Sequence, residues 1–143
     1  MEQYRQAIRQ FMISVNLIDG IYEIAAKQSG IKYNLLALLY ALDDGAPHSQ
    51  KEICQHWCIP KTTVNTIVQE CVRRGYITLD AGGGTKEKYI CLTEQGRAYA
   101  KPILERLYAM EERAMEKTMA QYPQEFVPAV EEFARNLMDE IEH

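Results

Sequence analysis

Apolar residues recur at alternating spacings of four and three through the first 28 positions of the chain, with polar residues between them. The members of this stripe are Tyr4, Ile8, Phe11, Val15, Ile18, Tyr22 and Ala25. Such spacing is typical of one face of an α-helix, and residues 3–28 contain no proline. A helix of about 25 residues is about 37 Å long, which exceeds the needs of one small core. We therefore expect part of this face to contact another chain.

Two short helices are predicted next. Leucines cluster at residues 35–42 and indicate a core helix, which the segment Asp-Asp-Gly-Ala-Pro at residues 43–47 ends. Ser49 and Glu52 then form the spacing of a capping box, in which a hydroxyl and a carboxylate satisfy free amides of a helix start. This predicts a helix of about two turns over residues 50–57.

A further helix is predicted after a tight turn at residues 58–60, because the fixed φ of Pro60 suits a helix start. Its apolar residues are spaced so that one face turns inward: Val64, Ile67, Val68, Cys71 and Val72. The opposite face carries polar side chains that can donate and accept hydrogen bonds. Gly75 ends the helix, after two arginines whose charges suit its C-terminus.

The rest of the chain predicts a β-hairpin and two more helices. Residues 76–79 and 89–92 are β-prone runs joined by a glycine-rich segment. Thr93 can cap a helix that runs past residue 115, with Pro102 inside it. A second apolar stripe then predicts a C-terminal helix, and its members are Phe126, Val130, Phe133, Leu137 and Ile141.

Helix, tight turn, helix and hairpin is the order of a winged helix-turn-helix, whose second helix enters the major groove of DNA. The predicted fold class is therefore mainly α with a small β-hairpin wing (α+β). We expect a single domain over residues 1–143, because this length fits one compact domain. Within it, residues 32–92 form the winged helix-turn-helix lobe, and residues 1–29 and 93–143 form long dimerisation helices at both ends.

Composition fits a soluble protein, with 47% hydrophobic and 25% charged residues. No stretch approaches the roughly 18–20 apolar residues of a membrane span. The first ten residues carry Glu2 and several glutamines, where a secretory signal needs a basic start and an apolar core. We therefore expect cytoplasmic residence.

The net charge of −4 weakly disfavours nucleic acid as a partner, but its distribution favours it. Residues 49–100 contain seven basic and five acidic residues, whereas residues 101–143 contain five basic and ten acidic residues. The acidity lies mainly in the C-terminal third, and the middle of the chain is the candidate DNA-facing part.

The sequence favours neither an enzyme nor a metal protein. It lacks a phosphate-cradling loop between a strand and a helix, a nucleophile elbow and a metal-ligand cluster. We therefore expect no cofactor and no metal, although Cys54, His56 and Cys58 lie close together. The four cysteines are expected to be reduced thiols, and they are Cys54, Cys58, Cys71 and Cys91.

The run SQKEICQHWCIPKTTVNTIVQECVRRGYI, followed by a hairpin and LTEQG, resembles the MarR family of bacterial transcriptional regulators. The resemblance spans nearly the whole chain and implies a two-fold dimer on a pseudo-palindromic operator. Pro60 stands where family members usually have Ser. The wing has Gly-Gly-Gly-Thr-Lys-Glu-Lys in place of Asp-x-Arg, so its minor-groove arginine is missing, and we expect Lys86 and Lys88 to bind phosphates instead.

The candidate DNA-binding residues lie mainly on the polar face of residues 61–73. Asn65 and Gln69 have amides that can bond bidentately to adenine. Contacts to phosphate or to a thymine methyl are expected from Thr62, Thr63 and Thr66, and backbone contacts from Lys61 and Arg73. A solvated helix face is the alternative for Gln69 and Arg73. Ser49 and Gln50 can bind phosphate at a helix N-terminus, although for Ser49 simple capping is favoured.

These observations predict a regulator, expected to be a repressor, that binds double-stranded DNA as a homodimer on an inverted-repeat operator. The resemblance implies a small-molecule effector, whose site the sequence leaves unknown. A tyrosine-lined pocket is one candidate, although tyrosines at helical spacing are more often core, and its members are Tyr22, Tyr33, Tyr40 and Tyr108. Two alternatives stay open. One is a winged-helix dimer with weak DNA affinity that binds another protein, and the other is a thiol- or metal-responsive regulator using Cys54 or Cys91.

Overall fold

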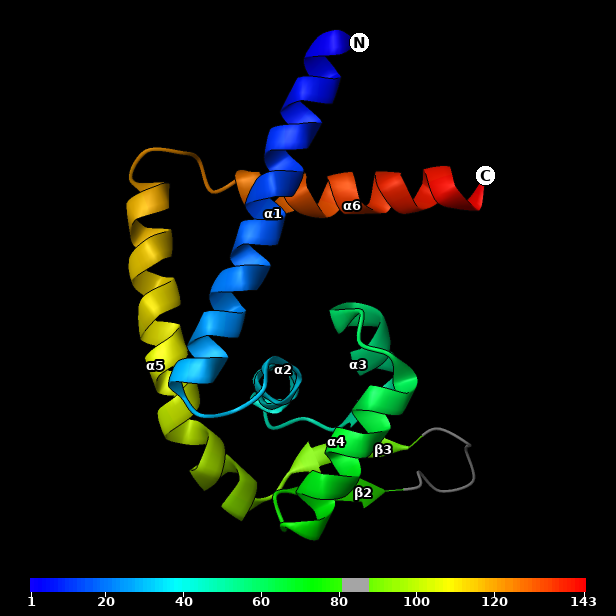
Figure 1. Ribbon diagram of the computed structural model, residues 1–143, viewed down its shortest axis with the longest axis vertical. Coiled ribbons are helices and arrows are strands. Elements are labelled where there is room, and N and C mark those ends of the chain that lie inside the picture. Colours follow the sequence, from blue (N-terminus) through cyan, green and yellow to red (C-terminus); the bar gives the residue numbers. More distant parts are fainter. Residues whose placement is uncertain (81–87) are drawn as a thin grey trace. The chain divides into compact units, whose positions relative to one another are not determined.

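The computed structural model describes residues 1–80 and 88–143, and it forms two compact units, Met1–Glu105 and Arg106–His143 (Figure 1). Within the described residues the chain is mainly helical, with a small three-stranded sheet. The helices are α1 (Glu2–Gln28), α2 (Tyr33–Leu42), α3 (Gln50–Trp57), α4 (Lys61–Arg73), α5 (Glu94–Met119) and α6 (Phe126–Glu142). The strands are β1 (His48–Ser49), β2 (Ile77–Asp80) and β3 (Tyr89–Leu92).

The sheet lies in the first unit and has the order β1-β3-β2, with both pairs antiparallel. Ile77 pairs with Leu92 and Asp80 pairs with Tyr89, so β2 and β3 form the predicted hairpin. The two-residue strand β1 pairs His48 with Ile90 and Ser49 with Tyr89. Since β1 leads directly into α3, this pairing ties the start of that helix to the return strand of the hairpin.

The core of the first unit lies where α2, α3 and α4 pack on one another and on this sheet (Figure 1). Four of the five leucines of α2 are buried, as are Val64 and Val68 on the inner face of α4, which packs against α2. Each large aliphatic side chain buried in this way contributes about 1.5–3 kcal/mol to folding. The lobe is therefore held by its own apolar core: Leu36, Leu38, Leu39, Leu42, Ile53, Ile59, Val64, Val68, Ile77, Ile90 and Leu92.

The start of α5 is fastened to the hairpin by a hydroxyl and a glycine. The Thr93 hydroxyl donates to the Gly75 carbonyl at 2.6 Å and accepts from the Gly96 amide at 2.9 Å, which caps the helix as predicted. A Cβ added at Gly96 would lie 2.0 Å from the Tyr76 carbonyl oxygen, so only glycine fits this approach. The Tyr76 and Tyr99 rings stack beside it at 4.3 Å.

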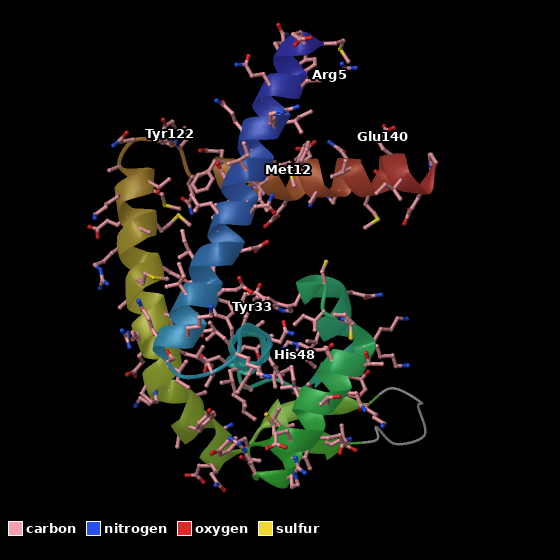
Figure 2. The ribbon with its side chains drawn as sticks, in the orientation of Figure 1. Arg5, Met12, Tyr33, His48, Tyr122 and Glu140 are labelled. Carbon is pink, nitrogen blue, oxygen red and sulfur yellow. The ribbon has the colours of Figure 1, made fainter. Side chains whose placement is uncertain are left out.

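Helices α1 and α6, each taken by itself, carry many exposed apolar side chains. On α1, Ile13, Leu17 and Ile24 are each more than half exposed. On α6, Leu137, Met138 and Ile141 are 50%, 55% and 76% exposed, and no residue of the helix is buried. Side chains project along the length of both helices in Figure 2. No helix among the described residues combines the length and apolar character that a membrane span requires.

Most predicted elements are confirmed, with small changes at their ends. The helix over residues 50–57 has the predicted bounds, and the Ser49 hydroxyl accepts from the Glu52 amide at 3.0 Å, which is one half of the predicted capping box. The Glu52 carboxylate contacts His48. The helix predicted from Pro60 begins at Lys61, with Pro60 as its N-cap. The strand predicted at residues 76–79 lies one residue later. The pairing of β1 was not predicted, because a two-residue strand leaves no alternating pattern.

Candidate nucleic-acid interface

The turn between α3 and α4 sets the direction in which α4 leaves the lobe. Cys58 ends α3 in the left-handed conformation with φ 50°, which reverses the chain in one residue. Ile59 follows and is buried, and Pro60 is exposed and extended with ψ 142°. The buried Ile59 anchors the turn to the core, so α4 starts at a fixed place on the surface.

Helix α4 presents the predicted polar face to solvent. Val64, Val68 and Cys71 are buried on its inner side. Thr63 is half-buried at the edge between the two sides. The candidate contact residues on the other side are exposed, and they are Lys61, Thr62, Asn65, Thr66, Gln69 and Arg73. The helix therefore offers amides, hydroxyls and cations on one continuous outward surface.

Several donors on this surface remain available for a ligand. The N-cap residue Pro60 makes no side-chain hydrogen bond to the first turn of α4, whose leading backbone amides have no partner within the helix. The Thr66 hydroxyl donates to the Thr62 carbonyl at 2.9 Å, which leaves its oxygen as an acceptor. A helix N-terminus with free amides attracts anions, including the phosphates of nucleic acid.

At the C-terminal end of α4, Glu70 forms ion pairs with both Arg73 and Arg74. Its Oε1 lies 3.0 Å from the Arg74 Nε, and its Oε2 contacts the Arg73 guanidinium. The exposed fractions of the Arg73, Arg74 and Glu70 side chains are 74%, 55% and 42%, so solvent screens these pairs. This partner of Arg73 was not predicted, although its spacing of three residues along the helix is one at which opposite charges pair.

A groove of about 1090 Å³ runs along α4 and reaches the start of α2. Lys32 and Asn34 at the N-terminus of α2 join the polar face of α4 as its lining. Neither residue was among the predicted contacts, because both are about 30 residues from α4 in the sequence and no local pattern places them beside it. The lining side chains predicted earlier are Thr62, Thr63, Asn65, Thr66, Gln69 and Arg73.

The remaining predicted contacts lie at the start of α3 and in the hairpin. Ser49 is buried and its hydroxyl caps α3, as the capping interpretation predicts. The Gln50 amide donates to the Lys88 carbonyl at 3.1 Å, and its side-chain Nε2 is buried without a partner among the described residues. Lys88 is exposed at the start of β3. Lys86 lies outside the described residues.

The candidate sensing residues have ordinary structural surroundings. Tyr40 packs edge to face on Trp57, with ring centres 5.5 Å apart. Burial raises the pKa of Tyr33, and Asp19 and Glu23 of α1 raise it further.

Among the cysteines, burial raises the pKa of the Cys71 thiol, against the opposing effect of Arg74, so this thiol stays protonated. Cys54 and Cys91 are half-buried, and Tyr22 and Tyr108 are half-buried on separate helices. No group of three or more metal-ligating side chains occurs within residues 1–80 and 88–143.

Helices α2, α3 and α4 with the β2–β3 hairpin have the arrangement of a winged helix-turn-helix protein, in which α4 is the exposed polar helix that follows the turn. Comparison with known proteins agrees. The model of the MarR family matches residues 29–85. NMB1585, a MarR family regulator from Neisseria meningitidis, aligns with a TM-score of 0.82 at 25% identity, covering 95% of this chain and 96% of that one. Residues 29–85 therefore match the MarR family model, and the chain as a whole is similar in fold to a MarR family regulator.

Other solved structures share the fold over the full length. Reduced AbfR bound to DNA aligns with a TM-score of 0.67 at 22% identity and full coverage of both chains, and AbfR is a protein of Staphylococcus epidermidis. The MarR family regulator SPO1453 from Silicibacter pomeroyi aligns with a TM-score of 0.71 at 18% identity over 94% of each chain. No curated protein matches the chain.

Proposed function

We propose that the chain acts as a homodimer that binds a pseudo-palindromic operator in duplex DNA and represses transcription by occupying it. The single observation that carries the DNA part is the outward face of α4. The exposed side-chain amides of Asn65 and Gln69, with a helix start whose N-cap Pro60 gives no side-chain hydrogen bond, match the groups that read base edges and bind phosphate. The DNA-bound structure of AbfR supports the same use of this fold.

In this proposal α4 of each subunit enters the major groove, with Asn65 and Gln69 at base edges. Lys61 and Arg73 contact the backbone at the two ends of the helix, and the threonines contact phosphate or thymine methyls. Ser49 caps α3 and makes no DNA contact in this proposal. Gln50, whose side-chain Nε2 is a buried donor without a partner among the described residues, is the proposed phosphate contact at the start of α3. Lys88, beside β3, and Lys86, which lies outside the described residues, add phosphate contacts that carry no sequence information.

The homodimer is supported by the apolar faces of α1 and α6. An isolated 17-residue helix is only marginally stable in water, and α6 has no buried residue of its own. Exposed apolar surface on this scale marks a contact with another protein surface. A second copy of the chain supplies such a surface at both ends, and a two-fold dimer then sets the spacing between the two copies of α4.

An effector is also part of the proposal. A small molecule that binds the two arrangements of the dimer with different affinity would change the separation of the two recognition helices. The chemical class of that molecule stays open.

Selection of bound duplexes from a random DNA pool tests the proposal, with the selected duplexes then measured across a salt series. We expect an inverted repeat with half-sites about one helical turn apart, and affinity that falls steeply with salt. Enrichment of no sequence, with weak retention that salt does not change, would contradict it and favour a protein-interaction module.

A further inference from the structure

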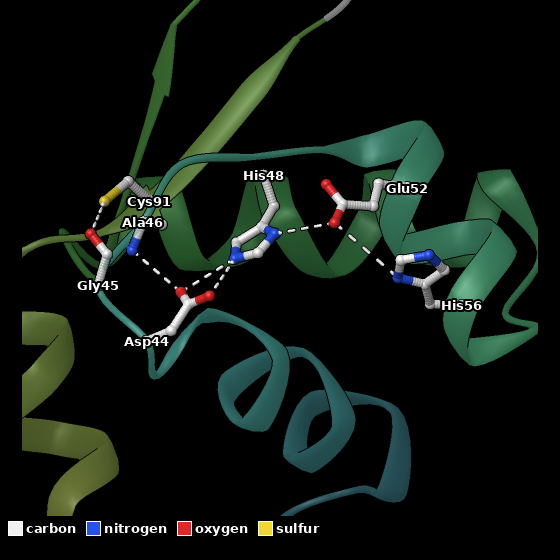
Figure 3. A network of polar contacts seen from close by, with 7 residues as sticks. All are labelled: Asp44, Gly45, Ala46, His48, Glu52, His56 and Cys91. Carbon is white, nitrogen blue, oxygen red and sulfur yellow. Dashed lines mark hydrogen bonds and ion pairs between the residues drawn. The ribbon is translucent and has the colours of Figure 1, made fainter. Parts of the chain in front are cut away.

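His48 lies between two carboxylates at the junction of α2, the sheet and α3 (Figure 3). Its Nε2 lies 2.9 Å from both oxygens of Asp44, in the turn that follows α2. Its Nδ1 lies 3.2 Å from Oε1 of Glu52, in the first turn of α3. The His48 side chain is 17% exposed, so solvent reaches these contacts only in part. One imidazole thus joins two elements that flank the proposed DNA surface.

The two carboxylate partners favour a protonated ring. Ionised carboxylates only accept hydrogen bonds, and a neutral imidazole has a single N–H to donate. Both contacts are made at once only by the imidazolium, which carries an N–H on each nitrogen. Loss of the proton leaves a nitrogen lone pair facing one of the two carboxylates, and that contact becomes repulsive.

The charged groups around His48 favour this proton. Asp44 from the turn and Glu52 from α3 face the ring, and His56 lies on the far side of Glu52, with its Nδ1 3.9 Å from the same Oε1. The strand β3 places Ile90 opposite His48, so it brings no charge there. Hydrogen bonding to Asp44 raises the pKa of His48, and Glu52 raises it further, while burial opposes both. The same hydrogen bond lowers the pKa of Asp44.

The contact with Glu52 lies at the start of α3, a segment that carries the proposed DNA contact Gln50 and is bonded to the base of the hairpin. The Glu52 amide is the one capped by Ser49, and the Gln50 amide bonds the Lys88 carbonyl at the base of the hairpin. The turn is also tied to β3, since the Cys91 thiol lies 3.5 Å from the Gly45 carbonyl and donates to it. A change at His48 therefore reaches the start of α3 and the return strand of the hairpin through bonded neighbours.

We propose that His48 is a positioning residue for DNA binding: its imidazolium, held between Asp44 and Glu52, fixes the start of α3 and the hairpin base, and DNA binding weakens when the proton is lost. The proposal rests on the proposed function, because it takes the lobe to be the DNA-binding surface. The sign follows from the raised pKa of His48. The imidazolium that contacts both Asp44 and Glu52 is fully populated at acidic pH, and it is lost as the pH rises through the pKa of His48.

The test measures two quantities over pH 5.5–8.5 at constant ionic strength: the NMR titration of the His48 ring and the affinity for a selected duplex. The wild type is compared with His48→Gln, which keeps a side-chain donor but does not titrate, and with Asp44→Asn. His56→Gln is the matched control, because it removes a histidine that lies near the same Glu52 carboxylate but does not contact Asp44.

We expect the wild-type affinity to fall about threefold to tenfold as His48 deprotonates, within the tenfold per pH unit that one linked proton allows. His48→Gln should give a flat profile, and His56→Gln should keep the wild-type one. Asp44→Asn should lower the pKa of His48 and move the affinity change to lower pH by the same amount. A purely structural role would instead lower affinity equally at every pH.

Three results would overturn the proposal: a His48→Gln profile that parallels the wild type, a His48 pKa at or below its usual value, or an unshifted profile in Asp44→Asn. Absence of duplex binding at every pH, in wild type and variants alike, would overturn the proposed function as well. The NMR titration separates these cases, because a raised pKa of His48 with no DNA binding would show that the contact exists but serves another role.

Discussion

The winged lobe buries its large apolar side chains, whereas the terminal helices α1 and α6 expose many of theirs. In the lobe, Leu38, Leu39 and Val68 are at most 2% exposed and pack among three helices and a sheet. On α6, Leu137 and Ile141 stand half exposed or more, and nothing on that helix is buried. The lobe therefore has an apolar core of its own, whereas the terminal helices leave apolar side chains exposed. Under the proposed function, the lobe binds DNA and the terminal helices join two chains.

The largest effect should follow from Leu137→Asp, which puts a charge into the proposed dimer interface twice because of the two-fold symmetry. Burial of one such side chain is worth about 1.5–3 kcal/mol, so we expect association to weaken by about 3–6 kcal/mol. Sedimentation equilibrium over a range of concentrations measures the loss. The control is Glu140→Gln on the same helix, and an unchanged dimer in Leu137→Asp would contradict the assigned interface.

Leu39→Ala tests the other side of the comparison, because Leu39 is fully buried within the lobe. We expect a loss of about 2–5 kcal/mol of unfolding free energy from the lost burial and the cavity left behind. Urea unfolding measures it, at two protein concentrations. The loss should be the same at both, whereas Leu137→Ala should show a loss that depends on concentration. Equal concentration dependence in the two variants would remove the distinction between the regions.

Glycines give a smaller and matched test of the same comparison. Gly96→Ala forces a Cβ against the Tyr76 carbonyl, so we expect a loss of about 1–3 kcal/mol in unfolding free energy. A Cβ added at Gly20, inside α1, has no neighbouring atom within 4 Å. Since alanine is a better helix former than glycine, Gly20→Ala should raise the unfolding free energy by about 0.5–1 kcal/mol. Thermal unfolding of both variants gives the two signs, and a stabilised Gly96→Ala would be incompatible with the close approach.

Asn65→Ala separates DNA reading from assembly, since Asn65 is exposed on α4. We expect a loss of about 1–3 kcal/mol in binding to the preferred duplex and a relaxed sequence preference, with the dimer unchanged. Competition binding between selected and random duplexes measures both. Glu116→Gln on α5 serves as an exposed control outside the lobe. Retention of both affinity and preference in Asn65→Ala would mean that another face of the helix meets the bases.

The smallest expected effect is that of Glu70→Gln, which releases Arg73 and Arg74 from their shared partner. Exposed pairs are worth about 0–1 kcal/mol, so stability should hardly change. Affinity for random DNA should rise, and the salt dependence should steepen by about one to two phosphate contacts, which the slope of log affinity against log salt measures. The same change made together with Arg73→Gln and Arg74→Gln should have no such effect if the ion pairs are its cause.

Local patterns in the sequence were sufficient to predict the helices, the hairpin and the exposed face of α4. The predictions hold there because helix period, caps and turn residues are all set by neighbours within a few positions, as Ser49 and Thr93 illustrate. The inward face of α4 followed directly from the spacing of its valines. For the same reason, the sequence alone places Asn65 and Gln69 on the outward face.

Contacts between distant segments could not be predicted in this way. The pairing of β1 with β3 and the place of Lys32 in the α4 groove depend on tertiary packing, which leaves no local signal. The contact of His48 with Asp44 and Glu52 was overlooked for a different reason. Its spacing of four residues on either side is visible in the sequence, but the three residues lie in a turn, a strand and a helix, so helix periodicity gave no cause to group them.

The central claim is that the lobe binds DNA while the terminal helices join two chains, and the mass of the complex on a selected duplex tests it most directly. Native mass spectrometry should find two 16.5 kDa chains on each duplex carrying both half-sites, and Leu137→Asp should reduce this to weakly held single chains. A single tightly bound wild-type chain per duplex, or two chains in Leu137→Asp held as firmly as in the wild type, would contradict the account.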